Sequence, residues 1–264
     1  MPPFAANGAR LSGHSYLGPS LGSLAGMSDG GDAATSRYRP MMSDERADKL
    51  REWHENAIAE GRREQTLTLA HLGWKFVVPP EVYAPHPLGL AEIILAEVRE
   101  NDRVLDMGTG SGVNAIAAAT RASYVLAVDV NPVAVACTRT NAELNGMASR
   151  IEARESDVFE SVSGRFDLVI FDPPFRWFRP HDLWERGTAD ENYAALTTFF
   201  RRVGDYLAPG GRIILSFGTT GDIDYLHHLI DEAHLDVEEL RKQEGEKDGL
   251  AVAYFAYRLT PCHR

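Results

Sequence analysis

The chain has 264 residues, of which 44% are hydrophobic and 25% are charged, and its 27 Lys and Arg against 38 Asp and Glu give a formal charge of −11. This composition is typical of a soluble globular protein with one large domain, or one domain and an appendage, and the acidic balance disfavours nucleic acid as a partner. The two cysteines, Cys137 and Cys262, form no C-x-x-C arrangement, which excludes a disulfide framework and a zinc site built from cysteines.

Signals for a membrane or for export are also missing. No apolar run approaches the ~20 residues that cross a bilayer, and the N-terminus has no basic segment followed by an apolar block. We therefore expect a cytoplasmic protein without a membrane partner, and pairing into a homodimer stays open.

The N-terminal part of the chain divides into two segments. Residues 1–40 contain seven glycines and many Ser, Ala and Pro residues without periodicity, which predicts a disordered leader. Residues 41–85 predict a cover of one helix and one hairpin. Ser43 is a plausible cap for a helix over about 44–61, and β-type runs at Gln65–Leu69 and Lys75–Val78 form a hairpin that Pro79 and Pro80 end.

Residues 86–264 alternate strands and helices, which predicts an α/β domain with a mainly parallel sheet covered on both faces. The turn at 244–249 makes the last two strands antiparallel neighbours. The expected strands are 103–107, 124–128, 150–155, 166–171, 212–217, 236–243 and 250–258, and the expected helices are 86–98, 112–121, 132–145, 191–207 and 222–234.

A glycine-rich loop follows the first of these strands, with glycines at positions 108, 110 and 112. Three ligands compete for such a loop. A phosphate-binding P-loop needs a Gly-Lys pair that is absent, and a dinucleotide loop wants glycine at position 113, where Val stands. The third ligand is S-adenosylmethionine, whose sulfonium and ammonium are cations. Asp106 at the strand end would repel a pyrophosphate and attract these cations, which favours S-adenosylmethionine as the cofactor.

Further polar residues end the next two strands. Asp129 lies where a carboxylate accepts both ribose hydroxyls, and Asn131 precedes Pro132 at the next helix start, so Asp129 could also act as a helix cap. Asp157 could accept the adenine amino group, with Val158 and Phe159 covering the ring. We predict that the cofactor is bound by Asp106, Gly108, Gly110, Gly112, Asp129, Asn131, Asp157 and Val158.

In order and spacing, the segments VLDMGTGSG, VLAVDVNP, SDVF and FDPPF resemble class I S-adenosylmethionine-dependent methyltransferases over about residues 76–258. The segment FVVPPEVYAPHPLGLAEIILAEV and the DPPF motif are similar to the branch that contains release-factor glutamine and adenine N6 methyltransferases. The resemblance implies a Rossmann-like, seven-stranded sheet whose last strand is antiparallel.

The DPPF motif, residues 172–175, predicts the acceptor site. Two prolines remove two N–H donors, so the Asp172 carboxylate and the Pro173 carbonyl form a purely accepting surface for an acceptor that presents N–H groups. The resemblance implies that Phe175 stacks on the planar acceptor. We therefore predict Asp172, Pro173 and Phe175 as catalytic residues; the alternative is a rigid turn that Asp172 caps.

The polar, aromatic stretch after this motif is typical of a substrate lid. Its acids could hold a guanidinium, and Arg176 could bind a substrate carboxylate in bidentate fashion. The alternative is a solvated loop with Trp177 packed inward. The predicted substrate-binding residues are Asp172, Phe175, Arg176, Trp177, Glu185 and Tyr193.

These residues predict an N-methyltransferase that needs no metal, since His227, His228 and His234 lack metal-ligand spacing. Relatives that act on the neutral glutamine amide often carry Asn where Asp172 stands, so our first hypothesis is a small-molecule substrate with a guanidino group, such as arginine. The alternatives are a protein glutamine side chain of release-factor type, adenine N6 in RNA, and a partner subunit that binds the cofactor without transfer.

Overall fold

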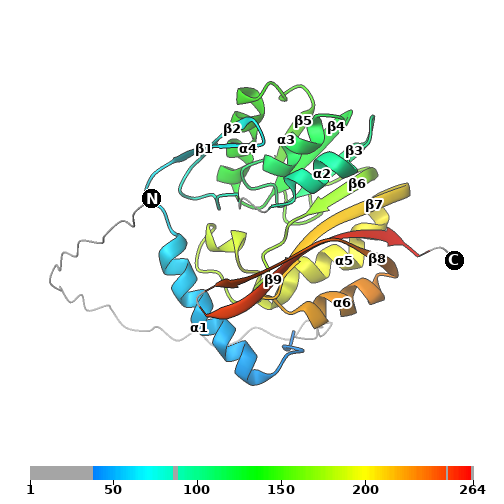
Figure 1. Cartoon of the computed structure of the whole chain (residues 1–264). Coiled ribbons are helices and arrows are strands. Elements are labelled where there is room, and N and C mark those ends of the chain that lie inside the picture. Colours follow the sequence, from blue (N-terminus) through cyan, green and yellow to red (C-terminus); the bar gives the residue numbers. More distant parts are fainter. Residues whose placement is uncertain (1–37, 86–88, 248, 263–264) are drawn as a thin grey trace, which may run out of the picture. The chain divides into compact units, whose positions relative to one another are not determined.

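The computed structural model describes residues 38–85, 89–247 and 249–262, which belong to one compact unit (Figure 1). The predicted leader lies outside the described residues up to position 37. Its last three residues, 38–40, are among the described residues, and the hydroxyl of Tyr38 donates to the carboxylate of Asp222. No described helix is both long and apolar enough to cross a bilayer.

A seven-stranded sheet in the order β5-β4-β3-β6-β7-β9-β8 forms the centre of the fold. Neighbouring strands are parallel from β5 through β7, whereas β9 inserts between β7 and β8 and is antiparallel to both. The predicted seven-stranded α/β fold with an antiparallel last strand is thus confirmed. The strands are β3 (Arg103–Met107), β4 (Tyr124–Asp129), β5 (Ile151–Glu155), β6 (Phe166–Phe171), β7 (Leu207–Gly218), β8 (Leu235–Lys247) and β9 (Leu250–Pro261).

Apolar residues on both faces of the strands hold the sheet between two helical layers. On β3 and β6, Val104 and Leu168 lie in one apolar cluster, and their neighbours Leu105 and Val169 lie in the other. The first cluster includes α2 (Ala91–Glu97) and α3 (Val113–Ala119), and the second includes α5 (Ala194–Tyr206) and α6 (Ile223–Glu232). Strands buried on both faces need continuous apolar runs, and the sequence has them.

The helix and hairpin before the sheet do not form a single cover. The helix α1 (Asp44–Gly61) has its predicted bounds and places Leu50 in the cluster that contains α5 and α6. The hairpin of β1 (Leu67–His71) and β2 (Trp74–Val78) packs instead on α4 (Pro132–Leu144), where Asn141 exchanges hydrogen bonds with the backbone of Val77. Figure 1 shows the β1–β2 hairpin beside α4, with α1 running below them.

Several predicted boundaries in the C-terminal half differ from the structure; β7, for example, starts at Leu207, five residues before the predicted strand. The segment before α5 forms two short 3-10 turns at Glu185–Gly187 and Glu191–Tyr193, so the helix starts three residues later than predicted. The predicted turn at 244–249 is mostly strand, because β8 continues to Lys247 and pairs with β9 up to that point.

Candidate active site

The glycine loop joins β3 to α3 at the carboxyl edge of the sheet. Gly108, Gly110 and Gly112 all have positive φ, of 69°, 55° and 81°. A Cβ at Gly108 would meet no atom within 4 Å, and one at Gly110 would meet only a backbone oxygen at 4.0 Å. The loop therefore leaves open space beside two of its glycines, where a ligand can approach the backbone.

Gly112 has a different function in the loop. A Cβ at this position would lie 3.0 Å from Cγ2 of Thr138 on α4. The glycine therefore lets the N-terminus of α3 approach α4 closely, which gives it a packing role in the loop.

Asp106 is buried at the end of β3 and is only half paired. Its Oδ2 accepts a hydrogen bond of 2.6 Å from the hydroxyl of Thr109, whereas its Oδ1 is buried without a partner among the described residues. Burial raises the pKa of this carboxyl group to about 7, and the charges of Asp172 and Asp129 act in the same direction. An unpaired buried carboxylate oxygen is costly, and a cation placed there would remove the cost.

Asp129 and Asn131 support the loop from β4. The Asp129 carboxylate accepts the N–H groups of Gly110 and Asn131, both at 2.9 Å. The Asn131 side chain caps α4 by accepting from Val133 N and donates to the carbonyl of Glu81. Asp129 thus shapes the glycine loop and keeps lone pairs for a diol. The amide of Asn131 makes one donated and one accepted hydrogen bond within the protein.

The loop after β5 carries the residues predicted for the adenine. Asp157 is exposed, and Val158 adopts a positive φ of 46°. Phe159 is stacked on Tyr206 at 4.2 Å between ring centroids and is buried in the core. The ring of Phe159 therefore does not cover a ligand, which leaves Asp157 and Val158 as the candidates at this position.

The acceptor corner follows β6, the strand beside β3. Asp172 keeps a solvent-accessible side chain, and its Oδ1 accepts a hydrogen bond from the hydroxyl of Ser216 on β7. The surrounding protein partly desolvates this carboxylate and so raises the pKa of Asp172, against the opposite effects of Ser216 and Arg241. Ser216 was not predicted from the sequence; the one polar residue in the apolar run of β7 is the signal that could have indicated it.

Phe175 and Tyr193 form the back of this corner. The Phe175 ring packs on Phe217 and Tyr254, with ring centroids 5.2 Å and 6.1 Å away. Tyr193 is completely buried, and its hydroxyl donates to the Phe175 carbonyl at 2.5 Å and accepts from the N–H of Asp222 at 2.8 Å. Tyr193 therefore positions the acceptor loop from behind, and the predicted direct contact with substrate is wrong.

Two other predicted substrate residues are also used inside the lid. Trp177 is buried against Phe178 and Tyr193. Glu185 is buried and accepts from Arg62 at 2.6 Å, as well as from the backbone and ring of His181. Both side chains have their partners within the protein, so we correct their predicted role from substrate binding to fixing the lid: Trp177 packs in the aromatic cluster, and Glu185 pairs with Arg62 at the end of α1.

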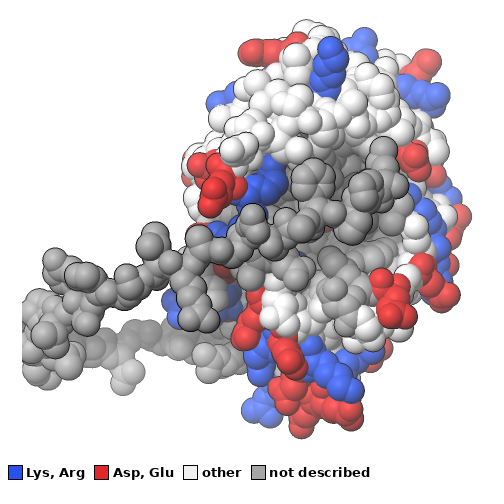
Figure 2. All heavy atoms as spheres, turned by 60° about the vertical axis from the view of Figure 1, so that its left-hand side comes forward, with Lys and Arg blue, Asp and Glu red and all other residues white. Residues whose placement is uncertain are grey.

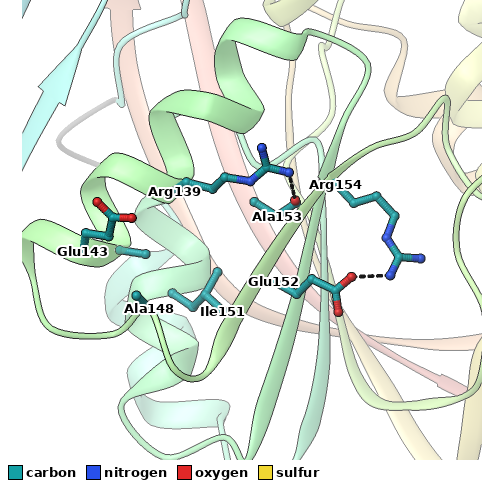
Figure 3. A pocket seen from close by; sticks show the side chains of 8 residues that line it. Arg139, Glu143, Ala148, Ile151, Glu152, Ala153 and Arg154 are labelled. Carbon is teal, nitrogen blue, oxygen red and sulfur yellow. Dashed lines mark hydrogen bonds and ion pairs between the residues drawn. The ribbon is translucent and has the colours of Figure 1, made fainter.

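A surface pocket lies elsewhere, between α4 and β5 (Figure 3). Three of its charged side chains are already paired: Arg139 donates to the Ala153 carbonyl, and Arg154 pairs with Glu152. The pocket follows the length of an edge strand and includes none of the predicted site residues. Among the residues that the structure describes, no group of three His, Cys, Asp or Glu side chains could hold a metal ion.

Comparison with known proteins identifies the family. Residues 73–245 match the methyltransferase small domain family. A release factor glutamine methyltransferase of Cereibacter sphaeroides is 35% identical over 164 residues, which make up 55% of this chain and 57% of that protein. A protein of Methanocaldococcus jannaschii with the provisional name protein N5-glutamine methyltransferase is 34% identical over 169 residues, 60% of this chain and 83% of the relative.

Solved structures agree with the fold. In a complex with tRNALeu, aTrm5 has a TM-score of 0.59 and 24% identity, over 84% of this chain and 68% of that chain. Methanocaldococcus jannaschii Trm5 in complex with adenosine has a TM-score of 0.58 and 23% identity, over 77% and 58%. At this identity the likeness shows the fold alone.

The residues at the glycine loop fit S-adenosylmethionine. The unpaired Oδ1 of Asp106 offers a partner for a cation, and the open space beside Gly108 and Gly110 admits a ligand next to the backbone. Asp172 ends the neighbouring strand, since β3 and β6 are paired in parallel up to Met107 and Phe171. The chain thus belongs to the methyltransferase small domain family and is an S-adenosylmethionine-dependent N-methyltransferase.

Proposed function

We propose that this enzyme methylates the side-chain amide nitrogen of glutamine in a protein acceptor. The observation that carries the proposal is the accepting corner at Asp172, whose carboxylate is solvent-accessible and oriented by the Ser216 hydroxyl beside the glycine loop. An amide NH2 presents two donors to such a corner. The names of the relatives from Cereibacter sphaeroides and Methanocaldococcus jannaschii support glutamine over our first hypothesis of a guanidino group.

The corner would act mainly by orientation. The amide nitrogen is a poor nucleophile because its lone pair is delocalised, so hydrogen bonds from its N–H groups to Asp172 and to the Pro173 carbonyl must hold it toward the methyl group. S-adenosylmethionine supplies an electrophilic methyl on a sulfonium. Fixing both reactants in line is the largest contribution that such a site can make.

A second candidate acceptor is a guanidino group, and the carboxylate at position 172 is the observation that favours it. A full negative charge forms stronger hydrogen bonds to a cation than to a neutral amide. The charge distribution speaks against RNA. The chain carries a charge of −11. On the face shown in Figure 2, basic and acidic side chains of the described residues are interspersed, and no broad basic surface is seen there.

The first test measures turnover with labelled S-adenosylmethionine on three acceptors: a release factor protein, free arginine and an RNA oligonucleotide. We expect label in the protein, at a glutamine residue. Label in free arginine alone would replace the proposal by the second candidate, and label in RNA alone would refute both.

The variant Asp172→Asn separates the two candidates at the residue itself. An asparagine oxygen still accepts from a neutral amide, so we expect the rate on a glutamine acceptor to stay within about tenfold of wild type. The rate on a guanidinium acceptor should fall by about 100-fold or more, because a charge that orients the acceptor is lost. Asp167→Asn, at the opposite end of the same strand, is the control and should leave both rates unchanged.

A further inference from the structure

Arg176 follows the acceptor motif directly and is fixed on one side only. Its Nε donates to the Thr188 carbonyl at 3.0 Å, and its guanidinium carbon lies 5.2 Å from the ring centroid of Trp53 on α1. These contacts hold the plane of the guanidinium. The structure gives its two terminal nitrogens, Nη1 and Nη2, no hydrogen-bond partner among the described residues.

Other arginines that are withdrawn from solvent have their charge or their donors matched. Arg212 pairs with Asp102 and two carbonyls, and Arg258 pairs with Glu97 and Glu238. Arg63 has no acid beside it, but donates to three carbonyls. Within the described ranges, Arg176 is the half-buried arginine with a single hydrogen bond and no acidic partner.

The surroundings of Arg176 do not supply an anion. Burial lowers the pKa of its guanidinium, and the side chains that act against this effect are three tyrosines, Tyr83, Tyr254 and Tyr193, with no Asp or Glu among them. An arginine nevertheless stays protonated in proteins. A buried cation without a counterion is unfavourable, and the cost is removed when an anion binds.

Neighbouring titratable groups leave this cation uncompensated. His54, whose ring packs at a tilt on that of Phe178 with 4.8 Å between centroids, has a pKa lowered to about 4, because burial and the charge of Arg176 oppose its protonation. Glu185 is the acid in electrostatic range of His54, and it is already paired with Arg62 and His181. The positive charge at Arg176 therefore remains available to a ligand.

We propose that Arg176 is a carboxylate-binding subsite of the acceptor site, which holds an acidic group of the acceptor while Asp172 holds its nitrogen. This inference rests on the proposed function for the placement of the acceptor. With Nε committed to Thr188, the two terminal nitrogens form an edge that matches the two oxygens of a carboxylate. The acidic chain disfavours a phosphate polymer as the source of the anion.

Binding of a carboxylate can be measured without knowing the acceptor. Acetate is titrated into the enzyme loaded with demethylated cofactor, and the side-chain Nε–H signal of Arg176, assigned through its loss in Arg176→Lys, is followed by NMR. We expect a saturable shift with acetate and none with neutral acetamide. Arg186→Gln, at an exposed lid arginine, should preserve the shift. If inorganic phosphate saturated the shift at a lower concentration than acetate, the assignment to a carboxylate would be overturned.

Turnover distinguishes the two sources of a carboxylate. One arm compares a release factor with a variant in which the acids flanking the methylated glutamine are replaced by their amides, and the other compares arginine with argininamide. We expect Arg176→Gln to raise KM about 10-fold or more for the carboxylate form of the true acceptor and to leave KM for its amide form and for S-adenosylmethionine unchanged. Arg176→Lys keeps the charge and should recover part of the loss.

The outcomes separate this inference from the proposed function. Acetate saturation that depends on Arg176, together with no label in any glutamine protein, retains the subsite and refutes glutamine as acceptor. No saturable shift with acetate, or an equal KM rise for the carboxylate and amide forms, refutes the subsite whatever the acceptor is, because a purely structural arginine would affect both forms alike.

Discussion

Asp106 lowers the stability of the folded chain at neutral pH, and the same carboxyl group provides a partner for the cationic cofactor. A carboxyl group with one unpaired oxygen and a pKa raised to about 7 is more easily protonated in the folded chain than in the unfolded chain. Its contribution to folding stability therefore decreases as pH rises from about 4 to 7, and does not recover above that range. A bound cation favours the ionised form of this carboxyl group, so the site selects a positively charged ligand.

This linkage predicts how the affinity for S-adenosylmethionine depends on pH. Because binding favours the ionised form of Asp106, affinity should increase by roughly tenfold between pH 6 and pH 7.5 and then level off. Calorimetry in two buffers with different ionisation enthalpies should detect close to one proton released at pH 6. Asp106→Asn should bind weakly and without this pH dependence; an unchanged pH profile in that variant would assign the titration to another group.

Gly112 and Gly146 allow backbone strain and steric overlap to be measured separately. Both have positive φ, but a Cβ at Gly146 meets nothing within 4 Å, whereas one at Gly112 meets Thr138 at 3.0 Å. Gly146→Ala should cost about 1–2 kcal/mol of unfolding free energy through backbone strain. Gly112→Ala should cost about 1–3 kcal/mol more through overpacking, measured by urea unfolding. Equal losses would mean that α3 can move away from α4 at no cost.

At the scale of whole elements, the sheet could be predicted because its strands are buried on both faces. Continuous apolar runs, such as those around Val104 and Leu168, fit a strand that is covered on both faces and no exposed position in the fold. That Asp106 and Asp172 lie at the same edge of the sheet could be predicted for the same reason, since paired parallel strands bring their carboxyl ends together.

The lid could not be predicted in this way, because its side chains are oriented by distant partners. Glu185 faces Arg62, which is 123 positions away in the sequence, and no local spacing indicates that pair. Tyr193 is another example, because its positive φ of 52° follows from the strained turn before α5 and turns its hydroxyl toward Phe175. The sequence pattern gives the polarity of such a stretch and leaves the direction of each side chain undetermined.

The contact between α5 and the acceptor loop gives a prediction for Tyr193. Tyr193→Phe removes the hydroxyl that joins the Phe175 carbonyl to the Asp222 N–H, which leaves two buried groups without their partner and should cost about 1–3 kcal/mol. We expect kcat to fall while the affinity for S-adenosylmethionine stays unchanged. Tyr225→Phe is the matched control, since Thr197 is the one hydrogen-bond partner of that hydroxyl among the described residues. A rate loss in Tyr225→Phe equal to that in Tyr193→Phe would point to general loosening of the aromatic cluster.

For the whole molecule, Asp222 connects the start of the described chain with the acceptor loop. Its Oδ2 accepts from the Tyr38 hydroxyl and from the Met41 N–H, both at 2.6 Å, and its own N–H donates to Tyr193. Burial and the Asp222 carboxylate raise the pKa of Tyr38 far above its ordinary value, so its hydroxyl stays protonated and donates. The segment before α1 therefore belongs to the catalytic unit in spite of its early position in the chain.

Two truncations test whether this segment stabilises the enzyme. A chain that starts at residue 37 keeps Tyr38, whose ring lies 4.9 Å from that of Tyr193, whereas a chain that starts at residue 41 loses it. Loss of a buried hydrogen bond and an aromatic contact should cost about 2–3 kcal/mol, so the shorter chain should melt several degrees lower. Because the same hydrogen bonds continue to the Phe175 carbonyl, its kcat should fall in parallel, and Tyr38→Phe in the longer chain should reproduce part of both effects. If both truncated chains had the same melting temperature and rate, the link from Tyr38 through Asp222 would have no energetic role.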